Sequence, residues 1–68
     1  MIKEILTFRE KEVFNYLIKN NSVKEIAKEL NISEKTIRNH ISNVIQKLGV
    51  KNRTQAIIEL IKLGELTI

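Results

Sequence analysis

Six polar side chains between residues 35 and 46 suit hydrogen bonding to the edges of nucleic-acid bases. Their intervals alternate between three residues and one, so they share one face of a helix. In the major groove of DNA, arginine pairs with O6 and N7 of guanine, and asparagine or glutamine pairs with N6 and N7 of adenine. A solvated helix surface is the alternative, but such surfaces usually mix Glu with Lys, and this face carries no acid beyond its first turn. The six are Lys35, Arg38, Asn39, Ser42, Asn43 and Gln46.

Groups suited to phosphate oxygens surround this face. Ser33, Lys35 and Thr36 lie where the same helix is expected to begin, and free backbone N–H groups and the helix dipole attract an anion there. Four further cations could extend contacts with a phosphate backbone, although each is also an ordinary surface residue. These are Lys24, Lys47, Lys51 and Arg53. Such contacts position a protein on DNA without reading its sequence.

The positive charge of the chain is concentrated around the same region. The formal net charge is +4, and residues 22–53 hold seven Lys and Arg against three Glu, a surplus equal to that of the whole chain. A concentrated positive field attracts polyanions, which favours nucleic acid as the partner. A solvated helix face remains the alternative interpretation of the charge alone.

Catalytic and metal-binding constellations are absent from the sequence. It has no Cys and no Asp, and His40 is its single histidine. We therefore expect no enzyme, no metal and no other cofactor, and we place His40 at the border of the core or against a phosphate. Phe8, Phe14 and Tyr16 are too few for a base-stacking platform, and we expect them to pack in the core.

Capping residues and apolar spacing predict four helices, over about residues 8–20, 23–30, 34–48 and 53–63. In a capping box, the N-cap side chain and the residue three positions later satisfy each other's backbone N–H groups. Three pairs have this spacing, at the starts of the first, second and fourth helices: Thr7 with Glu10, Ser22 with Glu25, and Asn52 with Gln55. Ser33 is expected to cap the third helix, while Gly49 and Gly64 end the third and fourth.

Residues 23–48 have the pattern of a helix-turn-helix, in which a short helix, a turn and a longer helix follow one another. In the turn, Asn31 tolerates left-handed geometry, Ile32 fills the core and Ser33 caps the next helix. The same pattern occurs in helical hairpins that bind no nucleic acid. We expect an all-α fold, a single domain of residues 1–68 with four helices.

The expected compartment follows from composition. A chain without cysteine suits a reducing cytoplasm. No apolar run approaches the roughly 20 residues that span a bilayer, so we expect no membrane partner. If the chain binds DNA in a bacterium, it is expected in the cytoplasm, at the nucleoid.

The fourth helix has more apolar surface than one small core needs, since only Glu59 and Lys62 interrupt its apolar positions after residue 55. A two-fold partner would bury the surplus and place two recognition helices about one DNA turn, roughly 34 Å, apart on a palindromic site. The alternative is that the helix packs entirely into its own core. The expected homodimer interface is Ala56, Ile57, Leu60, Ile61 and Leu63.

Two segments are specific enough to indicate a family: ISEKTIRNHISNVIQKLGVKNRTQAI at residues 32–57 and LTFREKEVF at residues 6–14. With them, the chain resembles the DNA-binding domain of the LuxR family. Within the family it is most similar to a stand-alone regulator of late sporulation genes, including spore-coat genes. Most family members carry an additional N-terminal receiver or ligand-binding domain, and the lack of one here would leave control to the amount of protein made.

The resemblance implies a four-helix domain that dimerises through its fourth helix and reads the major groove with its third. It places base contacts on Arg38, Asn39 and Ser42, although other members often carry a longer side chain than Ser42. Backbone contacts fall on Lys24, Ser33, Lys35, Thr36, Asn43 and Lys47.

Two functions are weighed for such a chain. The first is a dimeric, sequence-specific regulator of transcription that binds double-stranded DNA at a palindromic or pseudo-palindromic site. The second is a protein-interaction module that docks on an acidic partner such as a subunit of RNA polymerase. Salt-sensitive retention of random duplex DNA distinguishes the first from the second.

Overall fold

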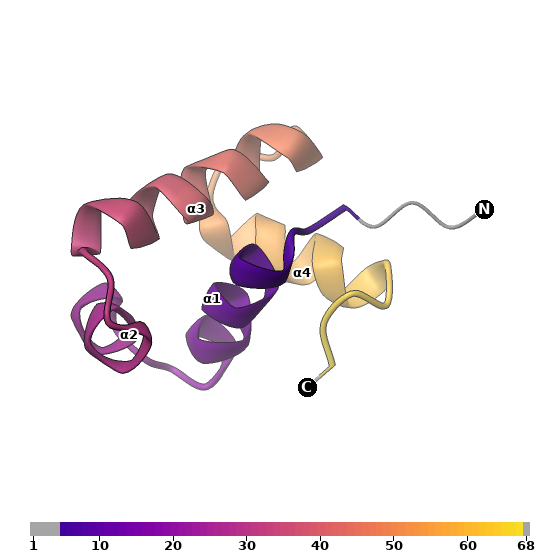
Figure 1. The fold of residues 1–68 in the computed structure, drawn as a ribbon. Helices are drawn as coiled ribbons and strands as arrows, with labels where there is room; N and C mark the ends of the chain where they lie inside the picture. The colour runs from indigo at the N-terminus through magenta and orange to yellow at the C-terminus, as the bar shows by residue number, and fades with distance from the viewer. Residues whose placement is uncertain (1–4, 68) are drawn as a thin grey trace.

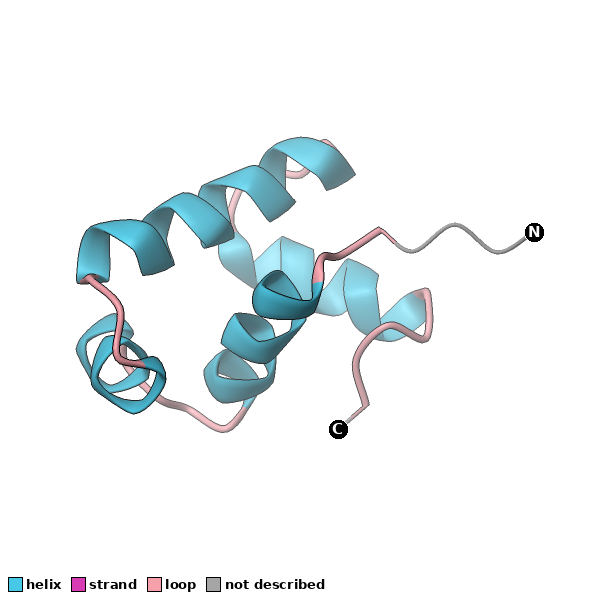
Figure 2. Cartoon of the chain, in the orientation of Figure 1, coloured by secondary structure: helices cyan, strands magenta, loops and turns pink. Residues whose placement is uncertain are grey.

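The computed structural model describes residues 5–67, which form four helices and no strand. These are α1 (Phe8–Ile18), α2 (Val23–Leu30), α3 (Glu34–Leu48) and α4 (Arg53–Lys62), shown in Figures 1 and 2. The all-α fold is as expected, while residues 1–4 and 68 of the expected domain lie outside the described part. Within that part, no helix is long and apolar enough to cross a membrane.

The first two capping boxes form as predicted. Thr7 Oγ1 accepts from the Glu10 backbone N–H and Glu10 Oε1 accepts from that of Thr7, and Ser22 and Glu25 form the same reciprocal pair. The prediction of the third capping box is only half confirmed. Asn52 Oδ1 accepts from the Gln55 N–H at 2.9 Å, but the Gln55 side chain accepts from the N–H of Lys51.

Two helices end earlier than the sequence predicts. α1 ends at Ile18 instead of residue 20, because Asn20 adopts a left-handed conformation with φ 67° that a helix cannot continue through. α4 ends at Lys62 instead of residue 63, shortly before Gly64, whose φ is 78°. The two differences amount to less than one helical turn each and leave the order of the helices unchanged.

The turn between α2 and α3 follows from its three residues. Asn31 adopts the left-handed conformation, with φ 56° and ψ 44°, and the backbone N–H of Ile32 donates to the carbonyl of Ala27 at 3.1 Å. Ile32 packs its side chain against the core, and Ser33 caps α3. This C-cap of α2 fixes the direction in which α3 leaves the turn.

The core lies beneath α3, which packs on each of the other three helices. In Figure 1, α3 runs across the top of the molecule, with the other helices below it. Its residues Ile37 and Val44 are fully buried, together with Phe14 of α1 and Ile26 of α2. The expectation that all aromatic residues pack in the core is wrong for Phe8, which is 80% exposed at the start of α1.

Candidate nucleic-acid interface

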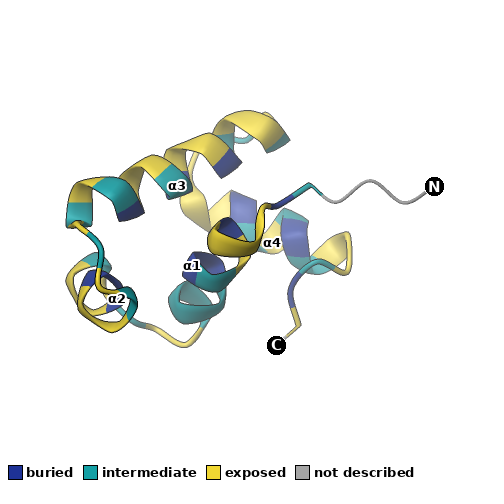
Figure 3. Cartoon of the chain, viewed as in Figure 1, coloured by how far each residue is buried: buried dark blue, intermediate teal, exposed yellow. Residues whose placement is uncertain are grey.

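The polar face of α3 is open to solvent along its whole length. All six of its members are exposed, whereas Ile37, Ile41 and Val44 on the opposite side are buried. Figure 3 shows this division, with exposed residues along the outer side of α3 and buried ones toward the other helices. The six, here called the α3 ridge, are Lys35, Arg38, Asn39, Ser42, Asn43 and Gln46.

Both ends of α3 are capped by hydrogen bonds, which makes the ridge a rigid platform. At the start, Ser33 Oγ accepts from the Thr36 backbone N–H at 3.1 Å. At the end, Gly49 has φ 67°, and the N–H of Val50 donates to the carbonyl of Ile45. A helix of 15 residues is roughly 22 Å long, and such a rod fits the wide major groove of DNA.

The three residues expected to contact bases lie next to one another on the ridge. Arg38, Asn39 and Ser42 are all exposed. Arg38 Nη2 donates to Glu34 Oε1 at 3.1 Å, one helical turn earlier. Glu34 was not among the predicted site residues, although a carboxylate four residues before an arginine on a helix is a recognisable pairing signal.

The expected phosphate-contacting residues divide into two groups. Lys24, Lys35 and Asn43 are exposed with no polar partner among residues 5–67. Ser33 and Thr36, by contrast, hydrogen-bond to each other through their hydroxyls at 2.9 Å. That bond uses one of the two hydroxyl protons, so the pair retains one O–H that can donate to a phosphate.

Lys47 is engaged within the protein, which argues against its expected phosphate contact. Its Nζ forms an ion pair with Oε1 of Glu10, which is only 3% exposed, and donates to the carbonyl of Ile5 at 3.3 Å. Burial raises the pKa of Glu10, but hydrogen bonds from Lys47 and from the Thr7 backbone outweigh that effect and hold the pKa below its usual 4.5. We therefore assign Lys47 to joining α3 to α1.

Replacing Lys47 with methionine is expected to lower the free energy of unfolding by about 1–3 kcal/mol, because a nearly buried carboxylate loses its charged partner. Urea denaturation of the purified protein measures this change. Lys51→Met is the matched control, since Lys51 is exposed outside the ion pairs of residues 5–67, and it should change stability by less than about 0.5 kcal/mol. Equal stability of both variants would contradict the assignment.

The pH dependence of stability provides a second check on the same ion pair. Because the pKa of Glu10 is lower in the folded protein, its contribution is full above the usual value of 4.5 and is lost as pH falls through the folded pKa. The wild-type protein should therefore lose stability below about pH 4.5 more steeply than Glu10→Gln, which has no charge to lose. Parallel curves for the two proteins would count against this role.

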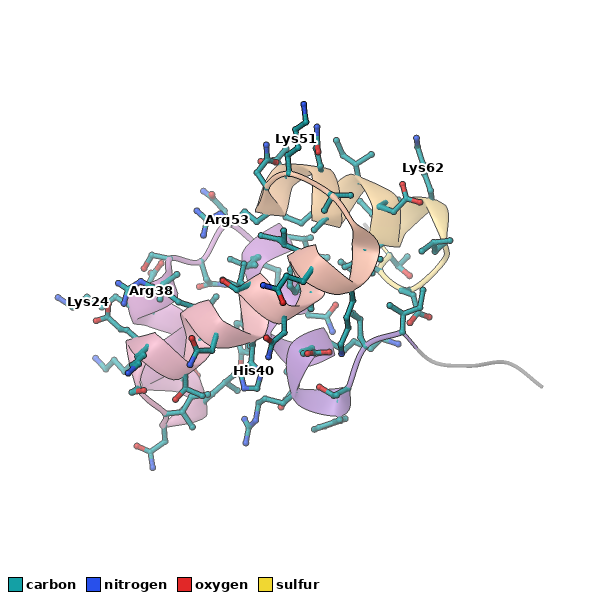
Figure 4. All side chains as sticks on the ribbon, turned by 90° about the horizontal axis from the view of Figure 1, so that it is seen from above. Lys24, Arg38, His40, Lys51, Arg53 and Lys62 are labelled. Atoms are coloured by element: carbon teal, nitrogen blue, oxygen red, sulfur yellow. The ribbon has the colours of Figure 1, made fainter. Side chains whose placement is uncertain are left out.

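Further cations border the ridge. Figure 4 looks onto α3 and shows Lys24 and Arg38 toward one end, with Lys51 and Arg53 extending from the segment where α4 begins. Lys51 and Arg53 are exposed, and the first turn of α4 contains no acidic residue. They therefore suit an anion beside the ridge, as the sequence suggests.

The expected dimer surface on α4 needs correction. Ala56 and Leu60 are 0% exposed because they fill the chain's own core, so they cannot contact a partner. Ile57 and Ile61 are half-buried, and Leu63 is 49% exposed. Ile58 was not part of the predicted interface, but it is 50% exposed and shares a helix face with Ile57 and Ile61. The spacing of these three isoleucines could have revealed that face.

Two further features, His40 and a surface pocket, lie outside the α3 ridge. His40 is half-buried on α3, and Figure 4 shows it on the opposite side of the helix from Arg53. Among residues 5–67, no group of three His, Asp and Glu side chains could hold a metal ion. The wall of a pocket of about 410 Å³ contains no residue of the α3 ridge. Its lining is Leu6, Thr7, Phe8, Lys11, Glu12, Asn15 and Glu65.

Known proteins share both the sequence and the fold. Residues 4–60 match the model of a family described as bacterial regulatory proteins, luxR family. The chain is 62% identical over 64 residues to the spore germination protein GerE of Bacillus subtilis (strain 168), a match that covers 94% of this chain and 86% of GerE. A solved structure of the transcription factor GerE superposes with a TM-score of 0.93 at 58% identity, covering 96% of this chain and 97% of the other.

Longer regulators match over only part of their length. The chain is 50% identical over 60 residues to the transcriptional regulatory protein DegU of Brevibacillus brevis. This match covers 88% of the chain and 25% of DegU.

Proposed function

This chain belongs to the luxR family of bacterial regulatory proteins, and from that premise we propose that α3 enters the major groove of a specific DNA site. The chain is a DNA-binding transcription regulator with the four-helix fold of that family. We infer that residues 1–68 act as one domain, with the helix-turn-helix at 23–48. Binding to DNA would place the protein at the bacterial nucleoid.

The full exposure of the α3 ridge is the observation that carries this proposal. Six side chains able to bond base edges or phosphates project from a rigid, capped helix, and the core lies on the other side. We assign base contacts to Arg38, Asn39 and Ser42. We assign backbone contacts to Lys24, Ser33, Lys35, Thr36 and Asn43, with Lys51 and Arg53 beside them, and Lys47 leaves this group because Glu10 engages it.

Selection of bound sequences from a pool of random duplexes tests this proposal. A sequence-specific dimer is expected to enrich a site with two-fold symmetry, whose half-sites lie about one helical turn apart. Affinity for random duplex should fall steeply as salt rises, because phosphate contacts release counterions. Recovery of no enriched sequence, or salt-independent binding, would contradict the proposal.

We propose that the dimer forms through one face of α4. The supporting observation is the apolar side chain of Ile58, which is half exposed between the partly buried Ile57 and Ile61. Leu63 extends this apolar surface at the end of the helix. A symmetric partner would cover the same patch on both subunits and orient two α3 ridges toward one palindromic site.

We propose that the regulated genes belong to sporulation. The support is the identity of 62% to a protein named for spore germination, across most of both chains. Locating the selected site in the genome of the source bacterium tests this: we expect it upstream of genes that are transcribed during spore formation.

A contact with RNA polymerase is a second candidate function, additional to DNA binding. The observation that favours a protein contact on α1 is Phe8, an apolar side chain that is 80% exposed and lines the pocket there. Phe8→Ser should leave DNA affinity unchanged while reducing activated transcription in a purified system by about fivefold or more. Unchanged transcription would rule out this contact.

A further inference from the structure

Glu34 is the single acidic residue of α3, and it lies at the start of the helix that carries the ridge. Its Oε1 accepts a hydrogen bond from Arg38 Nη2 at 3.1 Å. The Arg38 side chain is 63% exposed and that of Glu34 is 44% exposed. Ion pairs this open to solvent contribute little to folding. The pair therefore has little to do for the fold, and its place beside a base-contacting side chain points to DNA binding.

The charge of Glu34 opposes its surroundings. Ser33, Lys35 and the start of α3 all attract phosphate, whereas a carboxylate at the same helix end repels it. Phosphate attraction supplies essentially all of the affinity of a protein for DNA of arbitrary sequence. The carboxylate of Glu34 therefore lowers the sequence-independent part of binding.

The hydrogen bond also restricts Arg38. A guanidinium has five N–H donors, and Glu34 occupies one of them, so the others stay free for O6 and N7 of a guanine. An unpaired arginine would have more rotamers open to it and could bond any phosphate within reach. The hydrogen bond to Glu34, one helical turn earlier, instead favours the rotamers of Arg38 that lie along the helix.

We propose that Glu34 is a specificity-determining positioning residue, which holds Arg38 for a base edge and weakens binding to DNA that lacks the matching base. This inference rests on the proposed function, in which Arg38 contacts a base. It predicts that loss of Glu34 strengthens binding to random DNA and weakens binding to the selected site. The ratio of the two affinities is the quantity that Glu34 sets, in addition to the modest stabilisation that a carboxylate gives the first turn of a helix.

Affinities of three variants for the selected site and for random duplex test this role. Glu34→Gln removes the charge and should bind random duplex about threefold more tightly, with the preference for the selected site falling about tenfold. Glu34→Asp keeps the charge but is one methylene shorter, so random binding should stay near wild type while the preference falls at least about threefold. Glu29→Gln is the control, because Glu29 is exposed on α2 outside the ion pairs of residues 5–67, and it should keep the preference.

Two results would overturn the inference. One is a preference within about twofold of wild type in both Glu34 variants, and the other is an equal loss of preference in Glu29→Gln, which would make net charge the cause. Failure of the proposed function looks different, because wild-type protein would then bind selected and random duplex equally. Thermal unfolding of each variant verifies that it is folded.

Discussion

Ile58→Asp is expected to weaken binding to a palindromic site by about 100-fold. Ile58 is 50% exposed, so a carboxylate there stays solvated in the monomer and should leave the fold intact. In the dimer, the same carboxylate would be buried against apolar side chains of the partner, which strongly disfavours association. Each half-site would then be bound by a separate monomer, and the gain in affinity from linking the two subunits would be lost.

Sedimentation equilibrium and mobility shifts measure this effect. The variant should be monomeric at concentrations where wild type is dimeric, and its affinities for the palindrome and for a single half-site should be nearly equal. Asn20→Asp is the matched control, because it adds the same charge at an exposed turn between α1 and α2, distant from α3 in Figure 1. A threefold effect or less on palindrome affinity would show that α4 is not the dimer interface.

Arg38→Ala is expected to reduce the affinity for the selected site by about 1–3 kcal/mol, or roughly 5- to 150-fold. The reason is the loss of a bidentate partner for guanine from the exposed ridge. Random duplex offers Arg38 no fixed base partner, so binding to it should fall much less. Fluorescence anisotropy with both duplexes at one salt concentration measures the two changes.

The controls separate base recognition from charge. Arg38→Lys retains the positive charge but lacks the planar fork, so it should keep affinity for random duplex and lose much of the preference. Lys24→Ala removes an exposed cation on α2 and should weaken binding to both duplexes alike. It should also lower the slope of log affinity against log salt concentration by about one. An equal loss on selected and random duplex for Arg38→Ala would refute its contact with a base.

The helices and the turn between α2 and α3 could be predicted because local chemistry determines them. Thr7 with Glu10 and Ser22 with Glu25 act over three residues, and the left-handed conformation of Asn31 is a property of that residue type. The exposure of the ridge could also be predicted. Ile37, Ile41 and Val44 recur at helical spacing, which places them on the opposite face of the same helix.

Contacts between distant segments could not be predicted in the same way. Lys47 and Glu10 are 37 residues apart, and nothing in the local pattern of either residue marks them as partners. Periodicity showed that α4 has a wide apolar arc, but it could not tell which part faces its own core. Packing decides this, and it buries Ala56 and Leu60 while leaving Ile58 exposed.

The central claim is that the α3 ridge contacts bases in the major groove, and an NMR titration of isotope-labelled protein with the selected duplex tests it most directly. We expect the largest chemical-shift changes at Arg38, Asn39, Ser42 and Asn43, with small changes in α1. Methylation of guanine N7, an atom of the major groove, should block binding. Shift changes concentrated on α1 or α4, with signals of the ridge unmoved, would contradict the claim.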